Sequence, residues 1–246
     1  MALNIFRSAE DANPGGNKKQ FEDVVGSFRA GFAENGTPKS LDEWRVTTGD
    51  PEVADAIHAL LGGDPPRAWE TKGEESLEVY TEAKSVAVVL DSPSSVRQRF
   101  IQRNRNGEIV YTSDGAMKDD GERDPHASLS LDERLKLATD GLGPALETTI
   151  WFKLDDSMGQ VQLGAEYRGA SEIGKFRYSS TGKSIGKQVD RDQVEQEISD
   201  LIADGATGVR AKLEIEHVSF TAKSGPRAGK LVEYNTAKLK ILGAVR

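Results

Sequence analysis

The spacing of apolar residues around position 55 predicts a short amphipathic helix. Asp50 is a good N-cap because its carboxylate can accept the backbone N–H groups of the first turn, and Pro51 has no N–H to leave unbonded. Gly62 and Gly63 end the helix, since glycine adopts the left-handed conformation of a helix C-terminus at little cost. The side chains that share one face are Val53, Ile57, Leu60 and Leu61. We therefore expect one apolar stripe that packs on a neighbouring element.

Tryptophans stand on both sides of this helix, Trp44 before it and Trp69 after it. We expect both on short strands, where their rings would clamp the helix onto a sheet. Alternating or continuously apolar runs predict further strands at 77–81, 85–90, 100–102, 109–111, 148–154, 174–178, 209–220 and 230–242. Capping-box patterns predict two more helices, at 131–139 and after Asp190. The fold class is therefore α+β, a mostly antiparallel sheet or sheets with a few short amphipathic helices packed on them.

A strip of apolar residues precedes this region. Its members lie at helical spacing and are Phe21, Val24, Val25, Phe28 and Phe32. We predict a short helix, weakened by Gly26 and Gly31. Two interpretations stay open for it. The favoured one is a helix docked on the protein's own core, and the sharper one is an apolar strip that meets a partner protein.

Composition suggests how the chain is divided. Residues 1–20 contain a small, polar, Gly- and Pro-containing stretch, so we expect a mobile N-terminal segment. Residues 21–246 have enough apolar content for an α+β globular region. Within it we expect two intertwined subdomains, 21–111 and 145–246, joined by a polar loop and a short helix. These boundaries are predictions from sequence alone.

The net charge of −8 argues against a dedicated duplex-DNA binder, whose affinity comes largely from neutralised phosphates. The charge is uneven, because residues 206–246 carry +5 and the rest of the chain −13. The basic C-terminal residues include Arg227, Lys230 and Lys238. Such asymmetry suits steering towards a charged macromolecule.

Other sequence features indicate in which cellular compartment we expect the protein. No run of about 18 apolar residues exists, so we expect no membrane span, and the N-terminus lacks the apolar core of a signal peptide. The chain has no cysteine, which excludes disulfides, thiol catalysis and cysteine zinc sites. We expect a cytoplasmic protein.

Candidate catalytic or cofactor motifs are weak. Gly182-Lys183-Ser184 matches the end of a phosphate-binding loop, but Arg177 stands where that motif needs its first glycine. The three histidines are too far apart in sequence to share a metal by local spacing. No nucleophile stands in a pattern with a base and an orienting group. We therefore expect no enzyme, no cofactor and no metal.

The two C-terminal strands favour a different class of function. Their basic residues, with Phe220 and Tyr234, suit a groove for single-stranded nucleic acid. Only two aromatic residues lie there, and a solvated sheet face or a protein-contacting face fits the same pattern. A single-stranded-DNA-binding protein is thus an alternative function.

Three motifs carry a resemblance to a known family. They are GSFRAGF at 26–32, EWRVTTGDPEVA at 43–54, and LLGGDPP at 60–66 with the WET that begins at Trp69. In these motifs the chain resembles the Gp3-like recombination directionality factors of Streptomyces temperate phages, which act with large serine integrases. The resemblance extends over most of the chain. Relatives often carry cysteine pairs in the middle, and this chain has none, so no metal is carried over.

The resemblance implies a switch rather than an enzyme. Such a factor binds a phage large serine integrase, through the integrase's coiled-coil and zinc-domain region, and DNA only indirectly. It activates excision between the hybrid left and right attachment sites and inhibits integration. No membrane and no small-molecule substrate is implied, and the place of action is the cytoplasm of the bacterial host. The residues that we expect to contact the partner are Phe21, Val24, Phe28, Phe32, Arg227, Lys230 and Lys238.

Overall fold

The protein is an α+β structure, as predicted, and in the residues that the structure describes a large, mostly antiparallel sheet carries three short helices. The computed structural model describes residues 24–34, 37–71, 73–158, 169–181, 191–223 and 228–245. The predicted N-terminal segment 1–20, Phe21 and Arg227 lie outside these ranges. The helices are α2 (Pro51–Leu61), α3 (Leu131–Thr139) and α5 (Arg191–Ala203), and short 3-10 turns lie at Pro93–Ser95, Asp156–Met158 and Ala170–Glu172. The strands are β1 (Val24–Glu34), β2 (Thr37–Thr48), β3 (Arg67–Ala68), β4 (Leu77–Tyr80), β5 (Ser85–Leu90), β6 (Val96–Arg103), β7 (Ile109–Ser113), β8 (Ala145–Leu154), β9 (Lys175–Thr181), β10 (Gly208–Thr221) and β11 (Leu231–Val245).

The sheet connects parts of the chain that lie far apart in sequence. Its order is β11-β10-β5-β8-β9-β1-β2-β4-β3, with β6 paired to β8 and β7. Strands from 21–111 and from 145–246 are hydrogen-bonded to one another, because β5 pairs with β8 and β10, and β1 pairs with β9. The β1–β9 pair is parallel, and the other strand pairs are antiparallel in the described residues.

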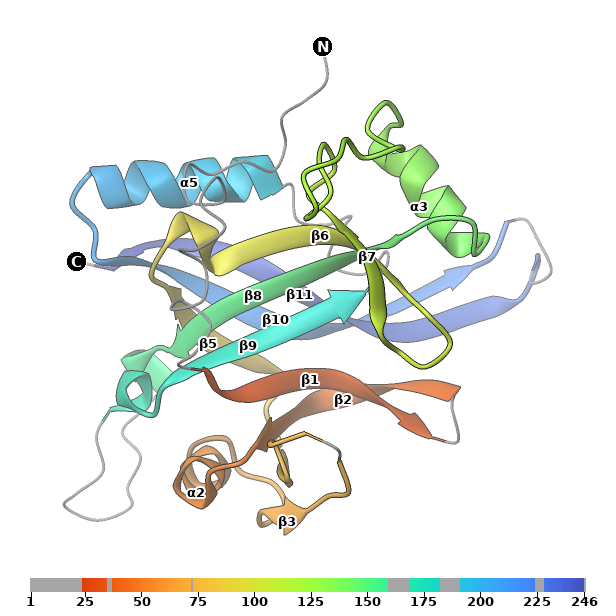
Figure 1. Cartoon of the computed structure of the whole chain (residues 1–246). Helices are drawn as coiled ribbons and strands as arrows, with labels where there is room; N and C mark the ends of the chain where they lie inside the picture. The colour runs from red at the N-terminus through yellow and green to blue at the C-terminus, as the bar shows by residue number, and fades with distance from the viewer. Residues whose placement is uncertain are drawn as a thin grey trace.

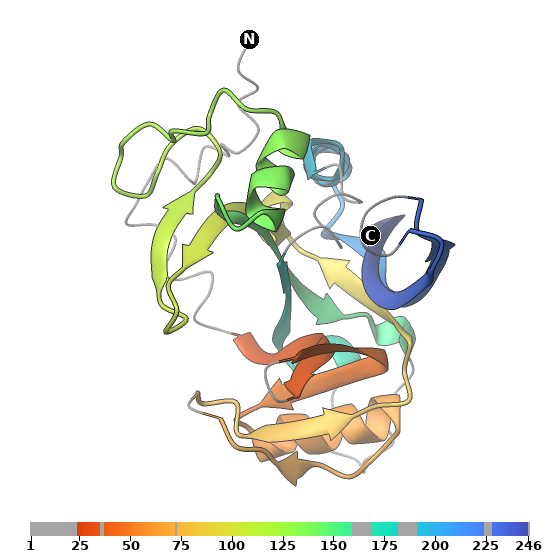
Figure 2. The same ribbon diagram turned by 90° about the vertical axis from the view of Figure 1, so that its right-hand side faces the viewer.

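The sheet is strongly curled, so that β11 comes near β2 (Figures 1 and 2). The side-chain amide of Asn235 on β11 donates to the backbone carbonyl of Leu41 on β2 at 3.0 Å. Helix α5 lies over β6, β10 and β11, α2 packs on β2 and β4, and α3 packs on β8. The concave side of the sheet therefore holds the main core.

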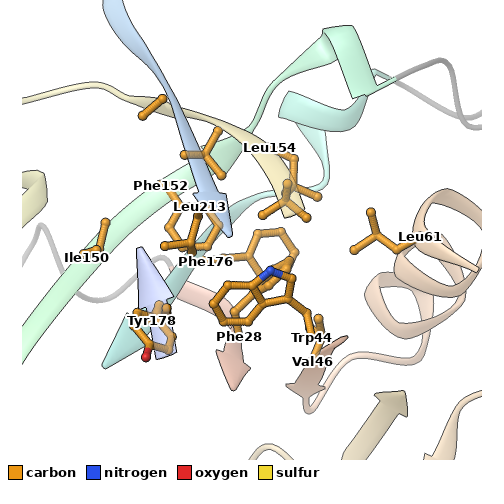
Figure 3. Close-up of a cluster of buried hydrophobic side chains, with 14 of the residues drawn as sticks. Phe28, Trp44, Val46, Leu61, Ile150, Phe152, Leu154, Phe176, Tyr178 and Leu213 are labelled. Atoms are coloured by element: carbon orange, nitrogen blue, oxygen red, sulfur yellow. The ribbon is translucent and has the colours of Figure 1, made fainter. Parts of the chain in front are cut away.

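That core centres on aromatic rings from strands of both halves of the chain (Figure 3). Phe28 of β1 is 1% exposed. Its ring lies 5.3 Å from those of Phe152 and Phe176 and 5.8 Å from that of Trp44, always edge to face. Edge-to-face pairs at these distances add to the free energy of burying the rings. One aromatic cluster thus joins β1, β2, β8 and β9.

Helix α2 has the start, end and buried face that the sequence predicts. The carboxylate of Asp50 accepts the backbone N–H of Glu52 at 2.8 Å. Gly62 follows the helix with φ 70°, which only glycine adopts readily. The buried side chains include Val53, Ile57 and Leu61, and Leu60 packs against the same core while half-buried.

The prediction of a helix at 21–32 is wrong, because residues 24–34 form strand β1. Val24, Phe28 and Phe32 are four residues apart, and that spacing places side chains on one face of a strand as well as of a helix. The glycines decide between the two. A Cβ on Gly26 would lie 2.7 Å from the carbonyl oxygen of Thr47, so the close approach of β2 depends on this glycine.

The polar loop between β7 and α3 is organised around a buried ion pair. Asp124 accepts from the guanidinium of Arg134 on α3 at 3.1 Å, and both side chains are at least nine-tenths buried. The Ser113 hydroxyl also donates to Asp124, and the Arg134 guanidinium lies 4.3 Å from the ring centre of Phe100. This cluster attaches α3 and the loop to β6 and β7.

Candidate partner-binding surface

The last two strands extend beyond the rest of the sheet as a two-stranded arm. Strand β10 pairs with β5 only over Val209–Glu214, but its pairing with β11 continues to Thr221 and Leu231. We call residues 215–221 and 231–237 the arm. In Figure 1 the two blue strands reach past the other strands on the right of the molecule.

One face of the arm is apolar and exposed. Val218 is opposite Tyr234 and Phe220 is opposite Val232, so these four side chains share a face. The rings of Phe220 and Tyr234 meet edge to face at 6.4 Å, yet remain 47% and 43% exposed. Val218 and Val232 lie beside these rings and are half-buried. Exposed aromatic side chains clustered in this way are typical of protein–protein contact surfaces.

The opposite face of the arm is polar and fixes its base. Nδ1 of His217 lies 3.0 Å from Oδ1 of Asn235, the residue opposite it. The amide of Asn235 also donates to Asp42 at 2.6 Å, in addition to its bond to the Leu41 carbonyl. These bonds hold the arm against β2. The arm is therefore amphipathic and attached firmly enough to present its apolar face.

The structure distributes the predicted contact residues over different places. Phe28 belongs to the core, so its side chain is not available to a partner, and the expectation that it contacts one is corrected. Val24 and Phe32 are half-buried on β1. Lys230 is exposed at the end of the arm, and Lys238 at its base forms an ion pair with Glu216. Lys230 and Lys238 thus flank the second strand of the arm, whereas Val24, Phe28 and Phe32 lie on β1, outside the arm.

The apolar face of the arm was only partly foreseeable. Phe220 and Tyr234 stand out in the sequence as the aromatic residues of the last strands, but only the register shows that Val218 and Val232 lie beside them. Residues 218, 220, 232 and 234 share a face because Val218 pairs with Tyr234. Cross-strand register is set by the turn and by the rest of the sheet, and the sequence alone does not reveal it.

A groove of about 770 Å³ opens beside the base of the arm. Its walls come from strands β1 and β9, with contributions from β2, β6, β8 and β11. The ionisable side chains that line it are Arg29, Lys39, Arg103, Glu147, Arg177, Tyr178 and Tyr234. Four of these are basic and one is a carboxylate, so the groove is locally positive on a protein of net charge −8.

Next to the groove, Glu75 joins the arginines of two strands. It accepts from Arg29 at 2.9 Å and from Arg177 at 3.1 Å, and the hydroxyls of Ser27 and Thr47 each donate to it at 2.6 Å. Burial raises the pKa of Glu75. The hydrogen bonds from Ser27 and Thr47 and the charge of Arg177 together lower it by more, so the pKa lies below its ordinary value. Glu75 therefore stays ionised and fixes both guanidinium groups.

Aromatic rings and guanidinium groups continue this network across the outer side of the sheet. The guanidinium of Arg45 lies 4.5 Å from the ring centre of Trp69, and that of Arg67 lies 4.6 Å from the ring centre of Tyr80. Glu78 forms an ion pair with Arg45 at 2.8 Å and accepts a hydrogen bond from Arg67 at 2.9 Å. Trp69 therefore packs on arginines, whereas the sequence suggested that it clamps α2.

The described residues contain no group of three or more His, Asp or Glu side chains that could hold a metal ion. Within the same ranges, no helix is both long and apolar enough to cross a bilayer. The features that remain are surfaces for binding: the arm with its aromatic face, and the basic groove beside it.

Part of the chain matches the model of a known protein family. Residues 25–129 match the family model described as Gp3-like, recombination directionality factor-like. The matched region spans β1 to β7 and ends in the loop before α3, which is less than half of the chain. It supports a phage function related to recombination. No solved structure matches the chain.

Proposed function

We propose that this protein is a phage recombination directionality factor that binds a large serine integrase. In this proposal it activates excision between the hybrid left and right attachment sites and inhibits integration, in the cytoplasm of the bacterial host. The observation that carries the proposal is the family match over residues 25–129. The function is regulatory rather than catalytic, as is general for such factors.

A directionality factor works by unequal binding. If it bound every arrangement of the integrase on DNA with the same affinity, it would shift no equilibrium between them. The factor must therefore prefer the arrangement formed on hybrid sites. The partner region that we propose is the coiled-coil and zinc-domain region of the integrase, and DNA is contacted through the integrase. The net charge of −8 suits a basic, DNA-binding partner.

The arm is the contact surface that we propose for the integrase. Phe220 and Tyr234 offer exposed aromatic area that is already held in place by the pairing of β10 with β11. A preordered aromatic surface loses little conformational entropy on binding. Lys230 directly precedes β11 and Lys238 lies at the base of the arm, and we retain both as contacts at the rim of this surface. Arg227 stays a proposed contact from the sequence alone.

The experiment compares two pairs of exposed apolar residues for association with purified integrase. Phe220→Ala with Tyr234→Ala should weaken association by about tenfold or more, because truncated central aromatic residues often reduce affinity by 1.4 kcal/mol or more. Ile109→Ala with Val110→Ala is the matched control, since these residues are 52% and 60% exposed on β7, away from the arm. The control pair should bind as the wild type does.

Two results would count against the proposal, and they differ. Equal binding by wild type and the arm variant would exclude the arm but not the function. No association between wild-type protein and integrase, with or without attachment-site DNA, would exclude the function. Melting curves of both variants show whether each is folded.

A second candidate function is binding of single-stranded DNA, favoured by the exposed Phe220 and Tyr234 beside Lys230. Bases stack on exposed aromatic rings, and lysine charges attract phosphates. Fluorescence anisotropy with a labelled oligonucleotide distinguishes this candidate. Tight, salt-sensitive binding in the absence of integrase would favour it over the directionality factor.

A further inference from the structure

The groove beside the arm is bordered by a strand edge that the described part of the sheet leaves without a neighbour. Strands β1 and β9 pair in parallel only from Val24–Lys175 to Phe28–Tyr178. Strand β1 continues to Glu34, paired with β2 on its other edge. Among the described residues, no backbone pairing occupies the β9-facing edge of β1 beyond Phe28. Residues 29–32 of this edge line the groove.

Unpaired strand edges are templates for another extended chain. Alternate residues along such an edge offer a backbone N–H and C=O that a strand alongside can satisfy. Recognition of peptides by strand addition uses these groups for affinity and the neighbouring side-chain positions for specificity. A groove of about 770 Å³ lies within the size range of ligand-binding clefts.

A buried hydroxyl in the groove wall gives a second, independent indication of a ligand. Thr236 is 3% exposed, and its Oγ1 has no hydrogen-bond partner in the described part of the structure. Thr236 is one of the residues that line the groove. A buried hydroxyl without a partner is destabilising, because it has lost its bonds to water and gained none in the protein. A ligand that bonds to this oxygen would remove that penalty.

The charges of the groove indicate which side chains the ligand carries. Arg29, Arg103 and Arg177 line it together with Lys39, against the single carboxylate Glu147. Since the protein as a whole carries −8, this groove is a positive region on an acidic molecule. Acidic side chains are therefore favoured there, and basic ones are disfavoured.

We propose that the groove binds an extended peptide segment of a partner protein, with acidic side chains, as an added strand along residues 29–32 of β1. The segment bonds to the backbone edge, its carboxylates face the arginines, and Thr236 bonds to it at the far wall. Nucleic acid fits less well. A peptide strand can both donate to and accept from the backbone groups of this edge, whereas a phosphate backbone has no N–H to donate. This proposal does not depend on the identity of the partner.

The test uses a fluorescein-labelled peptide of alternating glutamate and valine, about six residues long, which is the usual length of a strand. With the full-length protein we expect salt-sensitive binding at millimolar or lower peptide concentration. Hydrogen exchange of the amides of residues 29–32 should slow on binding. Two control peptides have lysine in place of glutamate, or N-methyl groups on alternate backbone nitrogens, and neither should bind.

Variants of the groove distinguish charge from backbone recognition. Arg103→Glu should weaken peptide binding by about tenfold, the effect of 1.4 kcal/mol, and Thr236→Val should weaken it without changing its salt dependence. Arg105→Glu is the matched charge reversal, because Arg105 is exposed in the adjacent turn and does not line the groove. It should leave binding nearly unchanged.

Three results would overturn the proposal. The first is absence of binding by the glutamate–valine peptide at millimolar concentration. The second is equal binding of the N-methylated peptide, which would exclude strand pairing. The third is displacement of the peptide by an oligothymidylate that protects the same amides more strongly, which would assign the groove to nucleic acid.

Discussion

Truncation of Phe28 separates the two roles that this residue can have, a core position and a partner contact. Its ring is 1% exposed and meets three other aromatic rings edge to face at 5.3 to 5.8 Å. Replacing a fully buried phenylalanine by alanine costs about 3 to 5 kcal/mol, and more where the surroundings cannot collapse into the cavity. Because four strands meet at this cluster, we expect Phe28→Ala to lower the free energy of unfolding by about 4 kcal/mol.

Thermal unfolding followed by circular dichroism measures this effect. For a chain of this size, 1 kcal/mol shifts the Tm by about 2 to 4 °C, so Phe28→Ala should lower it by roughly 8 to 16 °C. Phe220→Ala is the control, because the Phe220 ring is 47% exposed and its truncation should change stability by about 0.5 kcal/mol. A Tm for Phe28→Ala within about 2 °C of the wild type, combined with lost integrase binding, would refute the assignment of Phe28 to the core.

Three further predictions concern polar contacts. Arg134→Ala leaves Asp124 buried without its cation, so it should lower the free energy of urea unfolding by about 3 kcal/mol, and a loss below about 1 kcal/mol would contradict a buried ion pair. Asp50→Ala removes the N-cap of α2 and should lower the same free energy by about 1 kcal/mol, whereas no loss would argue against the cap. Because the folded-state pKa of Glu75 is lowered, its contribution is present above its ordinary pKa of 4.5 and is lost as pH falls through the lowered value. Glu75→Gln should thus be less stable than wild type at pH 7, the gap should narrow in unfolding curves below about pH 4.5, and a gap that does not depend on pH would count against this linkage.

Local features of the fold were predictable from sequence where the signal lies within a few residues. The caps of α2 and α3 and the alternation along β10 are of this kind, and the structure confirms them. The prediction of a helix at 21–32 failed because residues four apart share a face in helices and in strands alike. One of the two partner strands of β1, β9, lies about 150 residues further along the chain, as the bond from Arg177 to Ser27 shows.

The candidate surfaces were harder to predict for the same reason. The arm's aromatic face needs the register of β10 against β11, and the groove needs strands that are remote in sequence, such as β1, β9 and β11, to meet. The basic residues near the C-terminus indicated that this part of the chain differs in charge from the rest, but they did not predict where a binding surface lies. The pattern of Lys230 and Lys238 did not reveal that Lys238 is paired with Glu216.

The most direct test of the account is recombination in vitro with the cognate phage integrase and purified attachment-site DNA. The same integrase preparation acts on the phage and bacterial sites in one reaction and on the hybrid left and right sites in another, while this protein is titrated into both. The account predicts that excision of the hybrid sites begins only when the protein is present and that integration falls over the same concentration range. Hybrid sites that stay unrecombined at saturating protein, with integration unchanged, would contradict it.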